Sequence, residues 1–484
     1  MKKLLIALFL IAFLVGPLAP TLAESVPAKS FDYKDMDAAI TAQMDKHGLP
    51  GVAVAVIEGE EIVYLNGYGT AGKHVMTPET QMFIGSLSKS FTALIIAQLA
   101  EQDKIKLNAP VQQYIPWFEV ADQSYSDKIT INHLLHHTSG LSESGYSVML
   151  SPNTTSEEAT RSLAQAQPTA PLGREFQYFN LGYDVLTYII ERVTGEHYAD
   201  YLQNNILNPL GMTHSTGDPA AATDLSRGYT RLFGFAIPMT QQVRDYAIGS
   251  GYIVSSAEDM AKYALAIKNE ANGLISTEMY RLMMNPGLSS YGMGWHIADN
   301  GTKIFHGGAN ETFATHVNIY PKADRAFVLL INEGHQLDHL ISSDQMMKTV
   351  EAVVLGKTPP VFQGWSVRWI GWGIGILVVA LILLHVRNFY KLFNGWRQRA
   401  LEWTPLKKVW DVAISFIIPS IILIVVLSQI KAFYGYRFNF LTSLAYLRLG
   451  LPDIFILMLI GSLPDYIQGI IKLTWVVMDR TKSA

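Results

Sequence analysis

Two long apolar stretches near the C-terminus constrain the fold of this chain more than any other feature. They are residues 369–386 and 412–430, in which polar side chains are few. Each is close to the roughly 20 residues that a helix needs to cross a bilayer. A third and weaker stretch, 451–471, is interrupted by aspartate and proline residues and could lie at the membrane interface instead. We therefore predict a membrane region over residues 364–484, with the lipid bilayer as its partner.

Basic residues predict how this membrane region is oriented. Six lysines and arginines lie in the short loop 387–411, whereas the next loop, 431–450, has three. The positive-inside rule therefore places the first loop in the cytosol. The N-terminus independently predicts export, because a basic start, an apolar run and small residues describe a secretory signal peptide over 1–23, with an uncleaved anchor as the alternative. Both signals place residues 24–363 outside the cytoplasm, attached to the cell membrane.

The composition excludes several classes of function. The formal net charge is -4, from 37 basic and 41 acidic residues, so the strongly basic face of a nucleic-acid binder is not expected. The absence of cysteine excludes disulfides, thiol nucleophiles and cysteine-ligated zinc. His133, His136 and His137 resemble a metal cluster, but no carboxylate follows them at ligand spacing. We therefore interpret these histidines as structural and expect neither a metal nor a cofactor.

The segment between the signal peptide and the membrane region predicts an α+β fold. Strand-forming residues at 52–57 and 61–65 flank a Glu-Gly-Glu turn and predict a β-hairpin, and 316–320 with 325–331 predict a second one. Residues 86–102 have a helical apolar spacing without glycine or proline. Strands at both ends of a helix-rich middle predict one antiparallel sheet that the two ends share.

A serine and a lysine in the first turn of that predicted helix are candidates for catalysis. In the motif Ser86-x-x-Lys89, the spacing of three puts both side chains on one helix face, within reach of each other. The helix N-terminus favours negative charge on the serine oxygen, and partial burial makes the ammonium easier to deprotonate. A serine nucleophile needs both conditions. Alone the motif is weak, since about one or two such tetrads occur by chance in a chain of this length.

A second motif, Tyr178-x-Asn180, lies just before a helical stretch. Its tyrosine can shuttle a proton if nearby cations hold it as the phenolate, and its asparagine can hold the lysine and a substrate amide. The similar pair Tyr64 and Asn66 lies on a predicted strand before the serine, so we interpret that pair as structural.

The third motif is His306-Gly307-Gly308-Ala309, in the region of the last strands. Its glycines let the backbone approach a bound substrate closely. An edge strand at this place can pair with an extended substrate. It can also offer the amide of Ala309 to an oxyanion, together with the amide of Ser86.

The ordered set Ser-x-x-Lys, Tyr-x-Asn and His-x-Gly resembles the serine β-lactamase and penicillin-binding-protein superfamily, and in particular its class C β-lactamase-like branch. The other similar segments are 50–54, 131–141, 207–212 and 291–295. The similarity covers about residues 31–333 and stops before the membrane region. Each motif is modest, but several in this order are highly specific.

The resemblance implies a β-lactamase or transpeptidase-like fold, in which helices and a helical subdomain flank an antiparallel sheet. It also implies an acyl-enzyme mechanism. Ser86 would attack a carbonyl, Lys89 and Tyr178 would relay its proton, and water would release the acid. Asn180 would orient Lys89 and the substrate. Whether Lys89 or Tyr178 is the base stays open, as it does in related enzymes.

The chain departs from the family at one motif. Many β-lactamases and transpeptidases carry Lys-Thr-Gly where this chain has His306-Gly307-Gly308. Loss of the permanent cation and the hydroxyl weakens the grip on a substrate carboxylate, so we rank β-lactam hydrolysis below peptide or ester hydrolysis. Since histidine titrates near neutrality, His306 also predicts activity that depends on pH between about 6 and 7.

The sequence thus predicts a membrane-anchored serine hydrolase that acts on peptides containing D-residues or on small esters. It would be a carboxypeptidase, an esterase or a weak β-lactamase. The alternative is a receptor for β-lactams or cell-wall peptides that is acylated but turns over slowly. An inactive wall-binding domain is disfavoured, because every expected catalytic residue type is present. The sequence identifies no protein partner.

Overall fold

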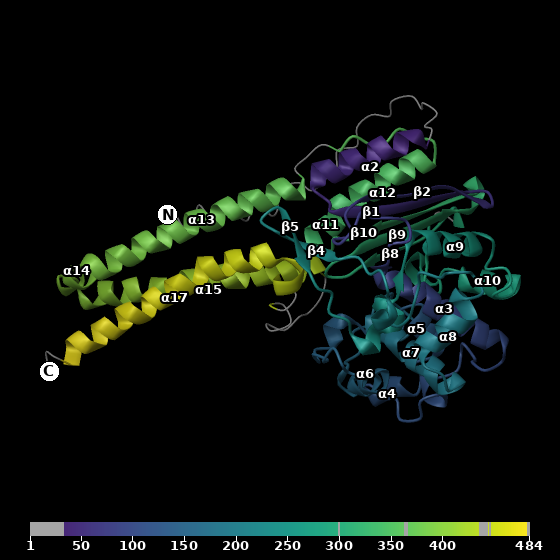
Figure 1. Ribbon diagram of the computed structural model, residues 1–484. Coiled ribbons are helices and arrows are strands. Elements are labelled where there is room, and N and C mark those ends of the chain that lie inside the picture. Colours follow the sequence, from purple (N-terminus) through teal and green to yellow (C-terminus); the bar gives the residue numbers. More distant parts are fainter. Residues whose placement is uncertain (1–32, 299–300, 363–365, 435–443, 445–446, 482–484) are drawn as a thin grey trace. The chain divides into compact units, whose positions relative to one another are not determined.

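The computed structural model describes residues 33–481, apart from 299–300, 363–365, 435–443 and 445–446 (Figure 1). The predicted signal peptide lies outside the described residues. The chain divides into two compact units, which are described separately below. The larger unit extends over 24–230 and 236–361, and the smaller unit contains 231–235 and 362–484.

An antiparallel sheet of six strands forms the centre of the larger unit, in the order β2-β1-β10-β9-β8-β7. Its strands are β1 (Gly51–Glu58), β2 (Glu61–Gly69), β7 (His296–Ala298), β8 (Lys303–Ala309), β9 (Ala314–Tyr320) and β10 (Arg325–Ile331). The first strand of the unit pairs with the last one, so that Val52 lies opposite Ile331. This pairing confirms the predicted sheet that both ends of the segment share.

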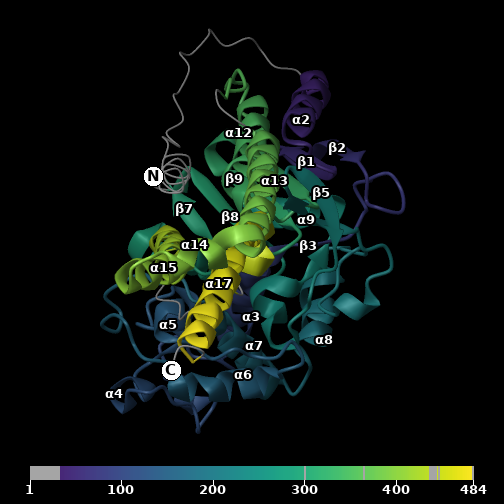
Figure 2. The same ribbon diagram turned by 90° about the vertical axis from the view of Figure 1, so that its left-hand side faces the viewer.

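Strand β1 explains why the sheet is covered on both faces. Its residues are apolar without interruption, and successive side chains point to opposite faces. Val52, Val54 and Val56 belong to one apolar cluster, while Ala53 and Ala55 belong to the other. The valines pack with α2 (Lys34–His47) and α12 (Ser342–Val354), which lie side by side on one face (Figures 1 and 2). Helices α3 (Ser88–Glu101) and α9 (Ala257–Lys268) lie on the other face (Figure 1).

The remaining helices of the larger unit form a subdomain beside α3. They are α4 (Gln123–Ser126), α5 (Ile131–Leu135), α6 (Ser156–Ser162), α7 (Asn180–Thr194), α8 (Tyr198–Leu202) and α10 (Thr277–Met283), whereas the short α11 (Gln336–Leu340) lies beside α12 (Figure 1). Two short strand pairs complete the elements, namely β3 (Met82–Phe83) with β6 (Val254–Ser255), and β4 (Gly228–Leu232) with β5 (Phe235–Met239). This arrangement confirms the predicted α+β fold of the β-lactamase and transpeptidase type.

Helix α3 differs from its prediction at its start. All of its residues from Ser88 to Leu99 are buried, so it is a core helix that is enclosed on every side. Ser86, which was expected inside the first helical turn, lies instead in the 3-10 turn Gly85–Leu87 that leads directly into α3. The tighter turn still keeps Ser86 three residues before Lys89, next to the helix N-terminus.

Among its described residues, the smaller unit contains three helices that are long and apolar enough to cross a membrane. They lie within α13 with α14 (367–401), α15 (405–428) and α17 (452–479). The full helices are α13 (Val367–Lys391), α14 (Arg397–Leu401), α15 (Pro405–Tyr434) and α17 (Pro452–Thr481). Each candidate span overlaps one of the three predicted stretches, and the first span continues to residue 401, beyond the predicted end at 386.

Helix α17 is the weak third stretch, and its polar residues have partners in the bundle. Asp465, one of the aspartates that interrupt this stretch, lies near the middle of α17. Its carboxylate lies 3.8 Å from Nδ1 of His385 in α13, and Lys472 pairs with Asp411 of α15 at 2.7 Å. Because these groups face neighbouring helices, the polar residues that weaken the sequence signal do not need to face lipid.

Candidate active site

The turn that carries Ser86 is fixed by its neighbours. Gly85 has a φ of 56°, and a Cβ atom there would lie 2.6 Å from the amide nitrogen of Ala309, so only glycine fits between the turn and β8. The hydroxyl of Ser88 donates to the Gly85 carbonyl at 2.8 Å and accepts the Ile253 N–H at 3.2 Å. The turn therefore presents Ser86 at a defined place between α3 and the end of β8.

Lys89 is fully buried directly beneath Ser86. Its Nζ donates to Oδ1 of Asn180 and to the carbonyl of Ser250, each at 2.7 Å, and lies 3.4 Å from Oγ of Ser86. Burial disfavours the ammonium, so the pKa of Lys89 is lowered from its ordinary value. The structure thus brings Ser86, Lys89 and Asn180 together, and it places an amine that loses its proton readily beside the serine.

Two carboxyl groups near Lys89 were not identified from the sequence. Asp184 lies one turn after Asn180 on α7 and is buried. Glu143 accepts both the backbone and the side-chain N–H of Asn180, at 3.3 and 3.2 Å. Burial raises the pKa of each carboxyl group, and the charge of each acid in turn favours the ammonium of Lys89.

One of these acids, Asp184, could have been identified from the sequence. Asp184 follows Asn180 by four residues on α7 and so lies on the same helix face, where a helical projection could have found it. Glu143 carries no such signal, because it reaches Asn180 from a separate turn 37 residues earlier in the chain.

Tyr178 completes the group around Lys89. The Nζ atom of Lys89 lies 4.8 Å from the centre of the Tyr178 ring. Burial raises the pKa of Tyr178 above its ordinary value, and the neighbouring Ser86 hydroxyl opposes this shift only in part. The phenol is therefore protonated at rest, and the phenolate considered from the sequence is not favoured here.

His137 positions Tyr178. Its ring lies against the Tyr178 ring, with centres 4.3 Å apart. Its carbonyl accepts the N–H of Gln177 at 2.7 Å, and its Nδ1 accepts the N–H of Phe179 at 3.2 Å. His137 therefore holds the residues on both sides of Tyr178, in agreement with its interpretation as a structural residue.

The last residues of β8 lie open beside the serine. Strand β7 pairs with residues 303–305 of β8, so among the described residues no strand pairs with the same edge of β8 from His306 to Ala309. A Cβ atom on Gly308 would lie 1.9 Å from the Ile84 carbonyl oxygen, which shows how closely this edge approaches the Ser86 turn. The edge can therefore accept an extended substrate, as the sequence suggested.

His306 does not titrate near neutrality, and this expectation from the sequence is wrong. Its Nδ1 lies 2.7 Å from the Gly307 carbonyl, which can only accept, so Nδ1 carries the proton and Nε2 accepts from the hydroxyl of Tyr291 at 3.2 Å. Burial, together with His296 and Lys89, lowers the pKa of His306 to about 3. The ring is therefore neutral at physiological pH and does not replace the cation of Lys-Thr-Gly.

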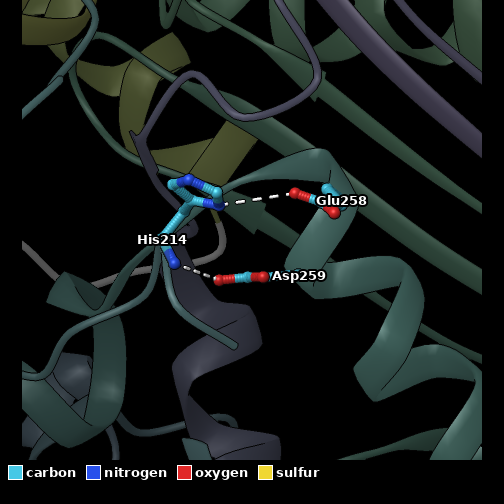
Figure 3. Close-up of side chains that lie close together, drawn as sticks. All are labelled: His214, Glu258 and Asp259. Atoms are coloured by element: carbon cyan, nitrogen blue, oxygen red, sulfur yellow. Dashed lines mark hydrogen bonds and ion pairs between the residues drawn. The ribbon is translucent and has the colours of Figure 1, made fainter. Parts of the chain in front are cut away.

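His214, Glu258 and Asp259 form a separate cluster at the start of α9 (Figure 3). Nδ1 of His214 lies 3.4 Å from Glu258, and its backbone N–H donates to Asp259 at 2.6 Å. Asp259 also accepts from Ser215 at 2.8 Å and pairs with Lys262 at 2.9 Å. A metal ion here would have to compete with the Lys262 ammonium, so the cluster anchors the segment of His214 and Ser215 to the first turn of α9.

Comparison with known proteins agrees with this geometry. A family model described as Beta-lactamase matches residues 36–347. The protein flp of Staphylococcus aureus strain COL is 26% identical over 331 residues, which cover 66% of this chain and 65% of that protein. The chain thus spans slightly less than two thirds of that relative's length.

Two further relatives are similar over comparable lengths. The unguisins hydrolase ungD' of Aspergillus campestris is 27% identical over 343 residues, which cover 63% of this chain and 62% of that protein. The solved structure of the octameric penicillin-binding protein homologue from Pyrococcus abyssi superposes with a TM-score of 0.59 at 27% identity. That match covers 68% of this chain and 78% of the other.

The lowered pKa of Lys89 makes a prediction about reactivity. The rate at which a fluorophosphonate probe modifies Ser86 should rise with pH as Lys89 loses its proton, well below the ordinary lysine pKa of 10.5. Asp184→Asn removes a charge that favours the ammonium, so it should move this rise to lower pH. His306→Asn should not move it, since His306 is already neutral. If the labelling rate rose only around pH 10, or if Asp184→Asn did not shift the rise, the lowered pKa assigned to Lys89 would be contradicted.

The close approach of Gly308 makes a second prediction. Gly308→Ala should slow probe labelling at least about tenfold and destabilise the fold by about 1–3 kcal/mol, because the new methyl group pushes β8 away from the Ser86 turn. The matched control is Gly307→Ala, whose Cβ would lie 3.5 Å or more from its neighbours. Labelling rates and thermal melting in detergent test both variants, and equal effects in the two would refute the packing argument.

Proposed function

Because this chain belongs to the β-lactamase family, we propose that it is a membrane-bound serine hydrolase in which Ser86 is transiently acylated. Its substrates are peptides that contain D-residues or small esters. The observation that carries this proposal is the buried amine of Lys89, which lies 3.4 Å from Oγ of Ser86 and has a lowered pKa. The similarity to ungD', which is itself named a hydrolase, supports the same reaction class.

The protonation states of Lys89 and Tyr178 suggest a separate proton transfer for each of them. Oγ of Ser86 attacks the substrate carbonyl carbon while its proton passes to the neutral amine of Lys89. Tyr178 is protonated at rest, so it can donate to the leaving group but cannot accept the first proton. The bond to the leaving group then breaks as that group takes a proton from Tyr178, and Lys89 passes the serine proton on to Tyr178, so that both groups return to their resting states. This division addresses the question that the sequence left open.

Deacylation returns the site to its starting state. Water attacks the acyl group on Ser86, the acid is released, and the serine recovers its proton. The amides of Ser86 and Ala309 lie on facing segments, and they are the proposed donors to the oxyanion in both steps. Asn180 contributes by holding Lys89 through its Oδ1 atom.

In this proposal the hydrolase faces the outside of the cell and is retained by α13, α15 and α17. The excess of basic residues in 387–411 and the predicted export signal support that orientation. A substrate derived from the cell wall would then be accessible without crossing the membrane.

The test uses the purified full chain in detergent with p-nitrophenyl butyrate, a D-Ala-D-Ala peptide and nitrocefin. Ser86→Ala should lower turnover of any active substrate at least about 10³-fold, because it removes the nucleophile. Mass spectrometry of the wild-type chain should show the acyl group on Ser86. Ser124→Ala, which changes an exposed serine on α4, is the matched control.

Two outcomes would contradict the proposal. Equal turnover by the wild-type chain and Ser86→Ala would exclude the acyl-enzyme. A single burst of product followed by no further turnover would instead favour the receptor that is acylated but hydrolyses slowly.

A further inference from the structure

An ion pair lies where β8 ends, next to the candidate active site. Nη2 of Arg244 lies 2.8 Å from Oε1 of Glu311, and Gln241 donates to the same carboxylate. Arg244 also donates to the hydroxyl of Tyr252. The Arg244 side chain is 31% exposed and the Glu311 side chain 16%, so the pair is accessible to a ligand but is largely enclosed.

Residues bonded in this pair lie close in sequence to residues of the candidate active site. Glu311 follows Ala309, the proposed oxyanion donor, by two residues. Tyr252 follows Ser250, whose carbonyl accepts from Lys89, by two residues as well. The pair therefore bridges two segments that build the site. Its cation also acts on the site electrostatically, since the charge of Arg244 opposes in part the rise that burial causes in the pKa of Asp184.

Both members of the pair are charged. Although burial opposes ionisation of Glu311, Arg244 and Gln241 hold the pKa of Glu311 below its ordinary value. A guanidinium is the side chain best suited to bind a substrate carboxylate, because its donors match the two carboxylate oxygens. In this chain Glu311 already occupies the position beside the Arg244 guanidinium that a substrate carboxylate would take.

Lys89, the other basic group near the site, also has partners already. Among the described residues, Lys89 and Arg244 are the cations that act on Asp184. Lys89 donates to Asn180 and Ser250, and His306 is neutral. A carboxylate next to the scissile bond would therefore lose its hydration without gaining a charged partner, which is unfavourable.

We propose that Glu311 masks Arg244 and thereby makes the site select neutral acyl substrates over those that carry a carboxylate beside the scissile bond. Esters and peptides with a blocked C-terminus are the substrate class that fits. This inference rests on the proposed function and narrows it, because peptides that end in a free D-residue become the poorer substrates.

The experiment compares two substrates that differ in this charge and in one methyl group, namely an N-acyl-D-alanyl thioester of thioglycolic acid and its methyl ester. The purified full chain in detergent should show a kcat/KM at least tenfold higher for the methyl ester. Glu311→Gln keeps the shape of the side chain but frees the guanidinium. It should shift this ratio at least tenfold towards the free acid, mainly through KM.

Two controls separate charge from folding. In the double variant Glu311→Gln/Arg244→Gln the shift should disappear, because no cation remains to bind the acid. Arg244→Gln alone leaves Glu311 as an unpaired negative charge, and it should move the ratio further towards the methyl ester. Thermal melting shows whether each variant is folded. The wild-type ratio needs no variant and tests the inference even if Glu311→Gln fails to fold.

The outcomes distinguish this inference from the proposed function. A wild-type preference for the free acid, or a folded Glu311→Gln with an unchanged ratio, would overturn the masking role of Glu311. If the wild-type chain hydrolysed neither thioester, or if Ser86→Ala hydrolysed them equally well, the proposed function on which the inference rests would be overturned instead.

Discussion

The burial of one lysine amine beside a serine is the constraint on which the rest of the larger unit depends. An ammonium removed from water costs several kcal/mol unless polar groups surround it. Here α7 supplies Asn180, the turn before β6 supplies the carbonyl of Ser250, and two acids lie nearby. The partners hold Lys89 in place, while its burial lowers the free energy needed to form the neutral amine. Helix α3 is enclosed on all sides because it must carry this residue into the core.

The sheet contributes by placing its last strands against the start of α3. Because β1 pairs with β10, the two ends of the unit are joined, and β9 and β8 follow outward from β10. Strand β7 is too short to cover the end of β8, so residues 306–309 face the Ser86 turn. Gly85 and Gly308 make the contact possible, since a side chain on either one would separate them. The segment that follows this strand end carries Glu311, whose charge we propose selects neutral substrates.

Much of the site could be predicted from motifs, and the exceptions have physical causes. The structure brings Ser86, Lys89, Tyr178 and Asn180 together because short motifs fix their local spacing on helix starts. Glu143 and the pair of Arg244 and Glu311 had no motif, since they meet their partners only through folding. His306 was placed correctly, but its ionisation was not, because burial and neighbouring groups decide a pKa.

The sequence by itself determined the α+β order of strands and helices, the three apolar stretches of the tail, and the motifs that hold the reactive groups. These depend on local periodicity and composition, which a linear pattern records. Only the tertiary structure decided that Tyr178 stays protonated, that His306 is neutral, and that Asp465 of α17 lies against a histidine of α13. The reason is that charge states and pairings depend on burial and on distances between segments far apart in the chain, which the order of residues does not specify.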